Sequence, residues 1–191
     1  MGGYGFDDLP VATQFVEIQK AWENFRHLAI KSPTGSGKSV GLPLLLAQKK
    51  LIKGQILVVQ PRRVAARLLA RRVARLYGCA VGEAVGYQVR FENKASPQSK
   101  IIYLTDGVLL QKFFSDPTLS RVGLIIFDEF HERSLQVDAS FALAKRICLV
   151  QRPSLRLIVT SATLELPRIT EYLSDCGSIE LFARSFPVEI V

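Results

Sequence analysis

Short apolar segments recur along this chain, and the strongest of them do not alternate between apolar and polar side chains. Residues 124–127 are apolar at every position, and residues 155–159 at every position except Arg156. Strands of this kind are typical of a parallel sheet that helices cover on both faces. Because longer helical patterns separate the apolar segments, we expect a three-layer α/β fold with right-handed crossovers and a mainly parallel central sheet.

The predicted elements alternate along the chain. The predicted strands span residues 28–31, 55–59, 84–88, 101–104, 123–127, 155–160 and 178–182. The predicted helices span residues 12–25, 38–51, 64–77, 107–115, 137–150 and 165–173. Residues 92–100 are polar and include a proline, so we expect a surface loop there. Active sites of such sheets lie beyond the carboxyl ends of the strands, which directs attention to the residues that follow each apolar segment.

Composition limits the partners of this chain. It has 191 residues, of which 48% are hydrophobic and 22% charged, the balance of a folded domain. We expect residues 1–8 to form a flexible N-terminal end and residues 9–191 a single domain. Apolar runs are too short to cross a bilayer and the first residues do not resemble a secretion signal, so we expect a cytoplasmic protein without a membrane partner. The net charge of +8 favours a polyanionic partner.

A loop of small residues, Ser-Pro-Thr-Gly-Ser-Gly-Lys-Ser at 32–39, follows the first predicted strand and opens a predicted helix. Small residues let the backbone wrap closely around a phosphate, and the helix adds its positive N-terminal end. In such loops Lys38 reaches the β- and γ-phosphates and the Ser39 hydroxyl binds Mg²⁺. The strict pattern has glycine in place of Ser32, so an ordinary turn is the alternative. The predicted phosphate-binding residues are Pro33, Thr34, Gly35, Ser36, Gly37, Lys38 and Ser39.

Two carboxylates, Asp128 and Glu129, come directly after the apolar segment 124–127. Charges at the end of a buried strand are costly unless they serve a cation or a reaction. Beside a phosphate loop, we expect Asp128 to hold Mg²⁺ through its water shell. We expect Glu129 to act as the general base that polarises the attacking water. The alternative is a pair of ordinary acids that face solvent.

A basic helix follows the second predicted strand and begins Pro-Arg-Arg at residues 61–63. Its arginines recur every four residues on one face, where like charges repel by a few tenths of a kcal/mol per pair, a cost that a polyanion would offset. Arg62 and Arg63, at the helix start, are placed best for the phosphates of nucleic acid; for the later arginines a solvated helix face is equally consistent. The predicted buried stripe of this helix is Val64, Leu68, Val73 and Leu76.

Two more strand ends carry small polar clusters, Thr105-Asp106-Gly107 and Ser161-Ala162-Thr163. Their hydroxyl and backbone groups suit contacts with a nucleic-acid backbone or with neighbouring loops. The same residue types commonly cap the next helix, and Asp106 fits that simpler role.

In order and spacing, these segments resemble the first RecA-like domain of a DEAH-box helicase of superfamily 2, of the bacterial HrpB type. The resemblance extends from residue 9 to the end of the chain. The matching motifs lie at residues 32–39 (I), 60–67 (Ia), 105–109 (Ib), 128–134 (II) and 161–163 (III), and residues 184–188 are also similar. Phe130 replaces the alanine of the Asp-Glu-Ala-His pattern, a change that the HrpB-type subgroup shares and that we expect not to affect the chemistry.

The resemblance implies an ATP-binding, ATP-hydrolysing lobe of a nucleic-acid-dependent helicase, with ATP or another NTP and Mg²⁺ as cofactors and single-stranded RNA as partner. Catalytic roles are implied for Lys38, Asp128 and Glu129, and a contact with the nucleotide base for Arg72. Nucleic-acid contacts are implied for Arg62, Arg63, Thr105, Asp106 and Gly107. Coupling of nucleotide state to strand movement is implied for His131, Ser161, Ala162 and Thr163.

The family completes its site with arginines from a second RecA-like lobe, which these residues do not include and which we expect in the full-length protein. The isolated chain is therefore expected to bind Mg-nucleotide, to hydrolyse it slowly and not to unwind nucleic acid. The alternatives are a non-catalytic RNA-binding module and a different P-loop ATPase. Retention of the lysine, serine and paired carboxylates weighs against the first, and the Pro-Arg-Arg and Ser-Ala-Thr segments weigh against the second.

Overall fold

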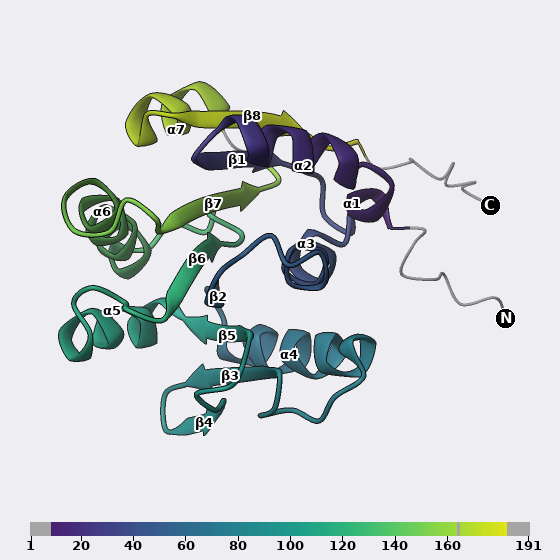
Figure 1. The fold of residues 1–191 in the computed structure, drawn as a ribbon, viewed down its shortest axis with the longest axis vertical. Helices are drawn as coiled ribbons and strands as arrows, with labels where there is room; N and C mark the ends of the chain where they lie inside the picture. The colour runs from purple at the N-terminus through teal and green to yellow at the C-terminus, as the bar shows by residue number, and fades with distance from the viewer. Residues whose placement is uncertain (1–8, 164, 183–191) are drawn as a thin grey trace, which may run out of the picture.

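The computed structural model describes residues 9–163 and 165–182; the expected flexible end at 1–8 and the family-like segment 184–188 lie outside this range. A single sheet runs through the described part (Figure 1). Its strands are β1 (His27–Lys31), β2 (Gln55–Gln60), β3 (Val85–Val89), β4 (Glu92–Lys94), β5 (Ile101–Thr105), β6 (Val122–Phe127), β7 (Arg156–Ser161) and β8 (Cys176–Glu180). They lie in the order β4-β3-β5-β2-β6-β7-β1-β8, and every neighbouring pair except β3–β4 is parallel.

Helices cover both faces of the sheet (Figure 1). One face carries α1 (Pro10–Thr13), α2 (Phe15–Asn24), α3 (Lys38–Gln48) and α4 (Arg63–Tyr77). The other carries α5 (Asp106–Ser115), α6 (Leu135–Val150) and α7 (Leu166–Leu173). The prediction of a three-layer α/β domain with a mainly parallel sheet is confirmed. Among the described residues, no helix has the length and apolarity that crossing a membrane requires.

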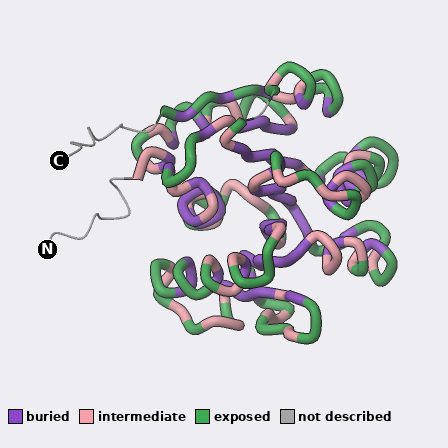
Figure 2. Tube along the Cα trace, turned by 180° about the vertical axis from the view of Figure 1, so that it is seen from behind, coloured by how far each residue is buried: buried purple, intermediate pink, exposed green. Residues whose placement is uncertain are grey.

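Successive residues of the central strands enter two separate cores. On β2, Ile56 and Val58 pack with α3 and α4, whereas Leu57 and Val59 pack with α5 and α6. All four are at most 2% exposed, and the strands appear as the most continuously buried part of the chain in Figure 2. Double burial explains why the central strands lack an alternating pattern, because neither face meets water.

Two local predictions are wrong. Part of the expected loop at 92–100 forms β4, which pairs antiparallel with β3; a polar sequence is tolerated there because the strand lies at the edge of the sheet. The helix expected over 12–25 is interrupted at Gln14, which separates α1 from α2. The Gln14 side chain instead bonds the backbone of Phe182 twice, at 2.9 and 3.1 Å, and so ties the start of the domain to its end.

The predicted buried stripe of α4 is also wrong except at Val73. Val64 and Leu68 are 64% and 57% exposed. The residues that α4 buries are Ala66, Ala70, Val73 and Ala74. Small side chains let the helix lie close to the sheet, so the larger apolar residues are left on the outer side.

Candidate functional site

The five motif segments follow the carboxyl ends of five adjacent strands. In the order β5, β2, β6, β7 and β1, these strands end at residues 105, 60, 127, 161 and 31. Segments that are separated by up to 130 residues in the sequence are therefore neighbours at one edge of the sheet. This is the edge at which ligands bind in open α/β sheets.

The phosphate loop joins β1 to α3 through two glycines with left-handed backbone. The φ angles of Gly35 and Gly37 are 81° and 80°, which side chains of other residues rarely adopt. A Cβ on Gly37 would also lie 2.8 Å from the Leu9 side chain. Lys38 is the first residue of α3, so the loop presents its amides and a lysine at the positive end of an 11-residue helix.

A cleft of ≈ 230 Å³ lies beside this loop. Its lining consists of Leu9, Thr34, Gly35, Gly37, Lys38, Ser39, Val40, Leu69, Arg72 and Glu129. Most of the predicted phosphate-binding residues and Arg72 thus share one cavity with the predicted general base. Pro33 and Ser36 do not line it, and Ser36 is buried, with its hydroxyl against that of Ser32. Leu9, Val40 and Leu69 carried no sequence signal.

Lys38 and Glu129 meet inside the cleft. Lys38 Nζ lies 2.8 Å from Glu129 Oε1, and the lysine side chain is only 3% exposed. Glu129 has a left-handed backbone with φ of 51°, in a turn that the Glu132 amide closes by donating to the Glu129 carbonyl at 2.9 Å. Such a conformation is costly for a residue with a side chain and is characteristic of functional sites. The turn aims the carboxylate of Glu129 back toward the phosphate loop.

Asp128 is held behind the cleft by side chains of the neighbouring strands. It is 5% exposed, and its two carboxylate oxygens accept hydrogen bonds from Gln60 Nε2 at 2.6 Å and Thr160 Oγ1 at 2.5 Å. Gln60 ends β2, and Thr160 lies near the end of β7, on either side of β6. Sequence reasoning missed both residues; a polar side chain at the end of an apolar strand was the available signal.

Phe130, the departure from the family pattern, points away from the cleft into the core. It is 3% exposed, and its ring lies 4.9 Å from that of Phe141 on α6, centroid to centroid.

The predicted coupling residues also lie together. His131 Nδ1 is 3.0 Å from Ser161 Oγ, and Ser161 Oγ accepts a hydrogen bond from the Thr163 amide at 3.1 Å. The Ser161 carbonyl accepts from the amide of Ser32, at the start of the phosphate loop, at 2.9 Å. One serine thus contacts both the acidic segment and the phosphate loop, with Ala162 next to it in the chain.

The predicted nucleic-acid residues lie on two neighbouring strand ends, since Gln60 of β2 is in register with Thr105 of β5. Arg62 and Arg63 are exposed at the start of α4, whereas Thr105 is 8% exposed. Arg62 makes a forked ion pair with Glu132, with distances of 3.1 and 3.2 Å.

Asp106 does not occupy the N-cap position, which belongs to Thr105, but lies in the first turn of α5. Its carboxylate accepts from the Gly107 amide at 2.8 Å and from the Ser134 hydroxyl at 2.9 Å. Ser134 is the N-cap of α6, so Asp106 joins the starts of two helices.

A buried tyrosine that the sequence did not single out contacts the phosphate loop. Tyr103 lies in the middle of β5, and its Oη donates to the Ser39 carbonyl at 2.6 Å. Burial, with the Asp128 charge as a second cause, raises the pKa of Tyr103 well above its usual value, so the hydroxyl keeps its proton.

The donors at this edge fit a magnesium–nucleotide better than a metal held by protein alone. Within residues 9–163 and 165–182, no group of three or more His, Cys, Asp or Glu side chains is arranged to hold a metal. Mg²⁺ commonly keeps several waters and binds one or two protein oxygens together with substrate phosphates. Ser39 lines the cleft, whereas Asp128 does not and its two oxygens accept from Gln60 and Thr160; these two residues, Ser39 and Asp128, would be the protein donors of such a site.

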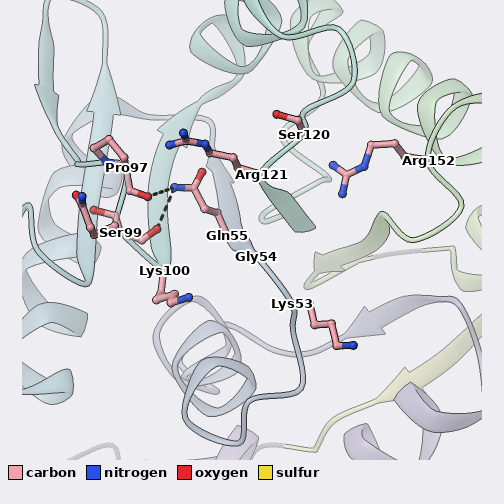
Figure 3. A pocket seen from close by; sticks show the side chains of 10 residues that line it. Lys53, Gly54, Gln55, Pro97, Ser99, Lys100, Ser120, Arg121 and Arg152 are labelled. Carbon is pink, nitrogen blue, oxygen red and sulfur yellow. Dashed lines mark hydrogen bonds between the residues drawn. The ribbon is translucent and has the colours of Figure 1, made fainter.

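A larger cavity, of ≈ 450 Å³, lies at the opposite edge of the sheet. Figure 3 shows Lys53, Lys100, Arg121 and Arg152 around it, and none of its lining residues carries a carboxylate. Gln55, at the start of β2, donates to the carbonyls of Pro97 and Ser99 at 3.4 and 3.1 Å. This cavity lies at the amino ends of the strands and has no phosphate loop, so it is distinct from the candidate site.

Comparisons with known proteins agree with this geometry. A family model described as DEAD/DEAH box helicase matches residues 13–172. ATP-dependent RNA helicase HrpB of Escherichia coli (strain K12) is 41% identical over 181 residues, which cover 95% of this chain and 22% of that protein. Pre-mRNA-splicing factor ATP-dependent RNA helicase prp22 of Schizosaccharomyces pombe is 42% identical over 187 residues, or 97% of this chain and 16% of that protein.

A crystal structure of the E. coli DExH-box NTPase HrpB superposes with a TM-score of 0.88 and 40% identity. That match covers 99% of this chain and 23% of the other. The chain thus spans less than a quarter of the length of these relatives.

Proposed function

Because the chain belongs to the DEAD/DEAH box helicase family, we propose that it is the ATP-binding lobe of an ATP-dependent RNA helicase. One observation carries the proposal: Lys38 of the phosphate loop and Glu129 of the acidic pair lie 2.8 Å apart in one cleft. A pure RNA-binding module would need neither residue in this arrangement. A P-loop ATPase of another class would not need Arg62, Arg63 and the polar segments of β5 and β7.

The proposed mechanism begins with an exchange of partners by Lys38. The amides of the loop and the Lys38 side chain bind the phosphates. This binding releases Glu129 from its ion pair with Lys38. Glu129 then accepts hydrogen bonds from the attacking water and polarises it as general base. Ser39 and Asp128 would hold Mg²⁺, which when bound neutralises charge on the phosphates. Gln60 and Thr160 keep the Asp128 carboxylate in place.

Nucleic-acid contact is proposed for Arg62 and Arg63, with Thr105, Asp106 and Gly107 on the adjacent strand end. Single-stranded RNA is the proposed partner, and the cytoplasm the proposed location. A second RecA-like lobe in the full-length protein would supply arginines to the site, and such an arginine contributes several orders of magnitude in rate. We therefore expect the isolated lobe to bind Mg-nucleotide, hydrolyse it slowly and not unwind a duplex.

Calorimetric titration with Mg-ADP tests the nucleotide site. Lys38→Ala should weaken binding by at least about 100-fold, since it removes a charge-assisted contact to phosphate made by a side chain that is only 3% exposed. Arg121→Ala, in the cavity at the opposite edge, is the matched control and should change the affinity less than about two-fold. Equal effects of the two substitutions would contradict the proposed site.

The nucleic-acid surface is tested by the anisotropy of a labelled single-stranded RNA at several salt concentrations. Arg62→Ala and Arg63→Ala should each weaken binding and reduce the salt dependence by about one counterion. Arg75→Ala, at the far end of the same helix, is the control. RNA binding that none of the three substitutions alters would place the nucleic-acid site elsewhere.

A further inference from the structure

The first turn of α3 contains a carbonyl that its own helix cannot satisfy. In an α-helix the carbonyl of Ser39 accepts a hydrogen bond from the amide of residue 43. That residue is Pro43, which lies inside α3 and has no amide hydrogen. Ser39 is half-buried, and because carbonyls shielded from water are rarely left without a partner, a donor from outside the helix is needed in place of the missing amide.

The donor comes from the sheet. The Tyr103 hydroxyl donates to the Ser39 carbonyl at 2.6 Å, across 64 positions of the sequence. Tyr103 is 0% exposed and is among the largest fully buried side chains of the domain. Its hydroxyl, buried in the same core, needs a partner as much as the carbonyl does. Each group therefore satisfies the other, and α3 is tied to β5 at the residue that follows Lys38.

We propose that Tyr103 is a positioning residue for Ser39. The Tyr103 hydroxyl supplies the hydrogen bond to the Ser39 carbonyl that residue 43, a proline, cannot donate. The inference rests on the proposed role of Ser39 as a magnesium ligand. A first turn anchored to β5 holds the Ser39 side chain at a fixed place in the cleft. Lys38 has its own partner in Glu129, so loss of the anchor affects Ser39 more than Lys38.

Three variants separate this role from simple packing: Tyr103→Phe, Pro43→Ala and the double substitution. Tyr103→Phe keeps the ring and removes the donor. It should weaken Mg-ADP binding about three- to ten-fold, while binding of ADP without Mg²⁺ changes less than about two-fold. Pro43→Ala restores the amide of the helix. In the double variant, Mg-ADP affinity should therefore return to within about two-fold of Pro43→Ala alone.

Tyr87→Phe is the matched control. Tyr87 lies on β3 in register with Tyr103 and is 2% exposed, but its hydroxyl bonds Glu92, away from the cleft. It should leave both ADP affinities unchanged. Urea unfolding of each variant checks the exchange of donors without nucleotide: Tyr103→Phe should lower the unfolding midpoint, and the loss should be smaller in the Pro43→Ala background.

The outcomes separate the two proposals. If the wild-type lobe binds no Mg-ADP, the proposed function is wrong and the role of Tyr103 toward Ser39 is wrong with it. If the wild type binds but Tyr103→Phe weakens ADP equally with and without Mg²⁺, or the Pro43→Ala background gives no rescue, Tyr103 is only a core residue. Those results would overturn the inference and leave the proposed function intact.

Discussion

At the carboxyl edge of the sheet Lys38 and Glu129 bind each other, whereas at the amino edge Arg152 and Arg156 bind backbone carbonyls. Arg152 donates to the carbonyls of Thr118 and Val122 at 3.2 and 2.9 Å and also contacts that of Leu119. These bonds join Arg152 to the turn before β6 and to the first residue of that strand, so they serve the fold. Lys38 faces a carboxylate in an open cleft, and in the proposed mechanism a phosphate replaces that partner.

Charge alone does not identify a functional edge of this sheet. The cavity at the amino edge is larger and more basic than the cleft beside the phosphate loop. One of its two arginines, Arg152, nevertheless closes the turn before β6, where it donates to backbone carbonyls. We therefore expect substitutions at the amino edge to affect stability, and substitutions at the carboxyl edge to affect ligand affinity.

The largest effect is expected for Arg156→Ala, at the start of β7. Arg156 donates to the carbonyls of Arg26 at 2.8 Å and Trp22 at 2.6 Å, and its guanidinium lies 3.2 Å from the centre of the Trp22 ring. Loss of charged donors to partly buried carbonyls and of the cation–π contact should lower the free energy of unfolding by about 3 kcal/mol.

Urea unfolding measures that loss, and Mg-ADP titration of the folded variant should match wild type. Arg156→Lys keeps the charge but loses the planar fork, so an intermediate stability is expected. A fully folded Arg156→Ala variant with weakened nucleotide binding would break the contrast between the two edges.

A smaller effect is expected from pH, through His27 at the amino end of β1. Burial, and then the charges of Arg26 and Arg156, lower the pKa of His27 from 6.5 to about 4. Its Nδ1 accepts a hydrogen bond from the Leu157 amide at 3.1 Å, which requires the neutral ring. In the unfolded chain His27 binds a proton more readily than in the folded protein. The stability that neutral His27 contributes is therefore complete above pH 6.5 and is lost as the pH falls toward 4.

Between pH 7 and pH 5 the free energy of unfolding should fall by about 2 kcal/mol. Urea titrations at the two pH values measure the change. His27→Gln retains an acceptor and should remove most of the pH dependence; if the dependence persists, another group is responsible.

The smallest effect is expected at the carboxyl edge, for Glu132→Gln. Glu132 pairs with the guanidinium of Arg62, so under the proposed function it would compete with an RNA phosphate for the same donors. Because exposed ion pairs contribute about 0.2–1 kcal/mol, the substitution should tighten RNA binding by about two- to five-fold.

RNA anisotropy compares this variant with Glu180→Gln, which removes the same charge from the Lys31–Glu180 pair at the end of β1. The effect of Glu132→Gln should vanish in an Arg62→Ala background. Equal tightening by both glutamine variants would mean that only net charge matters.

Much of the architecture was predictable from the sequence because its causes are local. Apolar segments without alternation indicated buried parallel strands, and Gly35 and Gly37 marked a loop whose φ angles other residues rarely adopt. Topology rules then place the ends of parallel strands at one edge, which brings Lys38 and Glu129 together. The fold class and the meeting of these motifs followed from those patterns, whereas β4 did not, because an edge strand needs no apolar pattern.

Only the tertiary structure decided which side chains support the site. Gln60 and Asp128 are 68 residues apart, and Tyr103 and Ser39 are 64 apart. Each contact depends on the register of neighbouring strands and on the distance of a helix from the sheet. The distance between α4 and the sheet likewise decided that this helix buries alanines and leaves Val64 and Leu68 exposed. The sequence determined the motifs because motifs are local; their partners depend on contacts that form only when the layers pack.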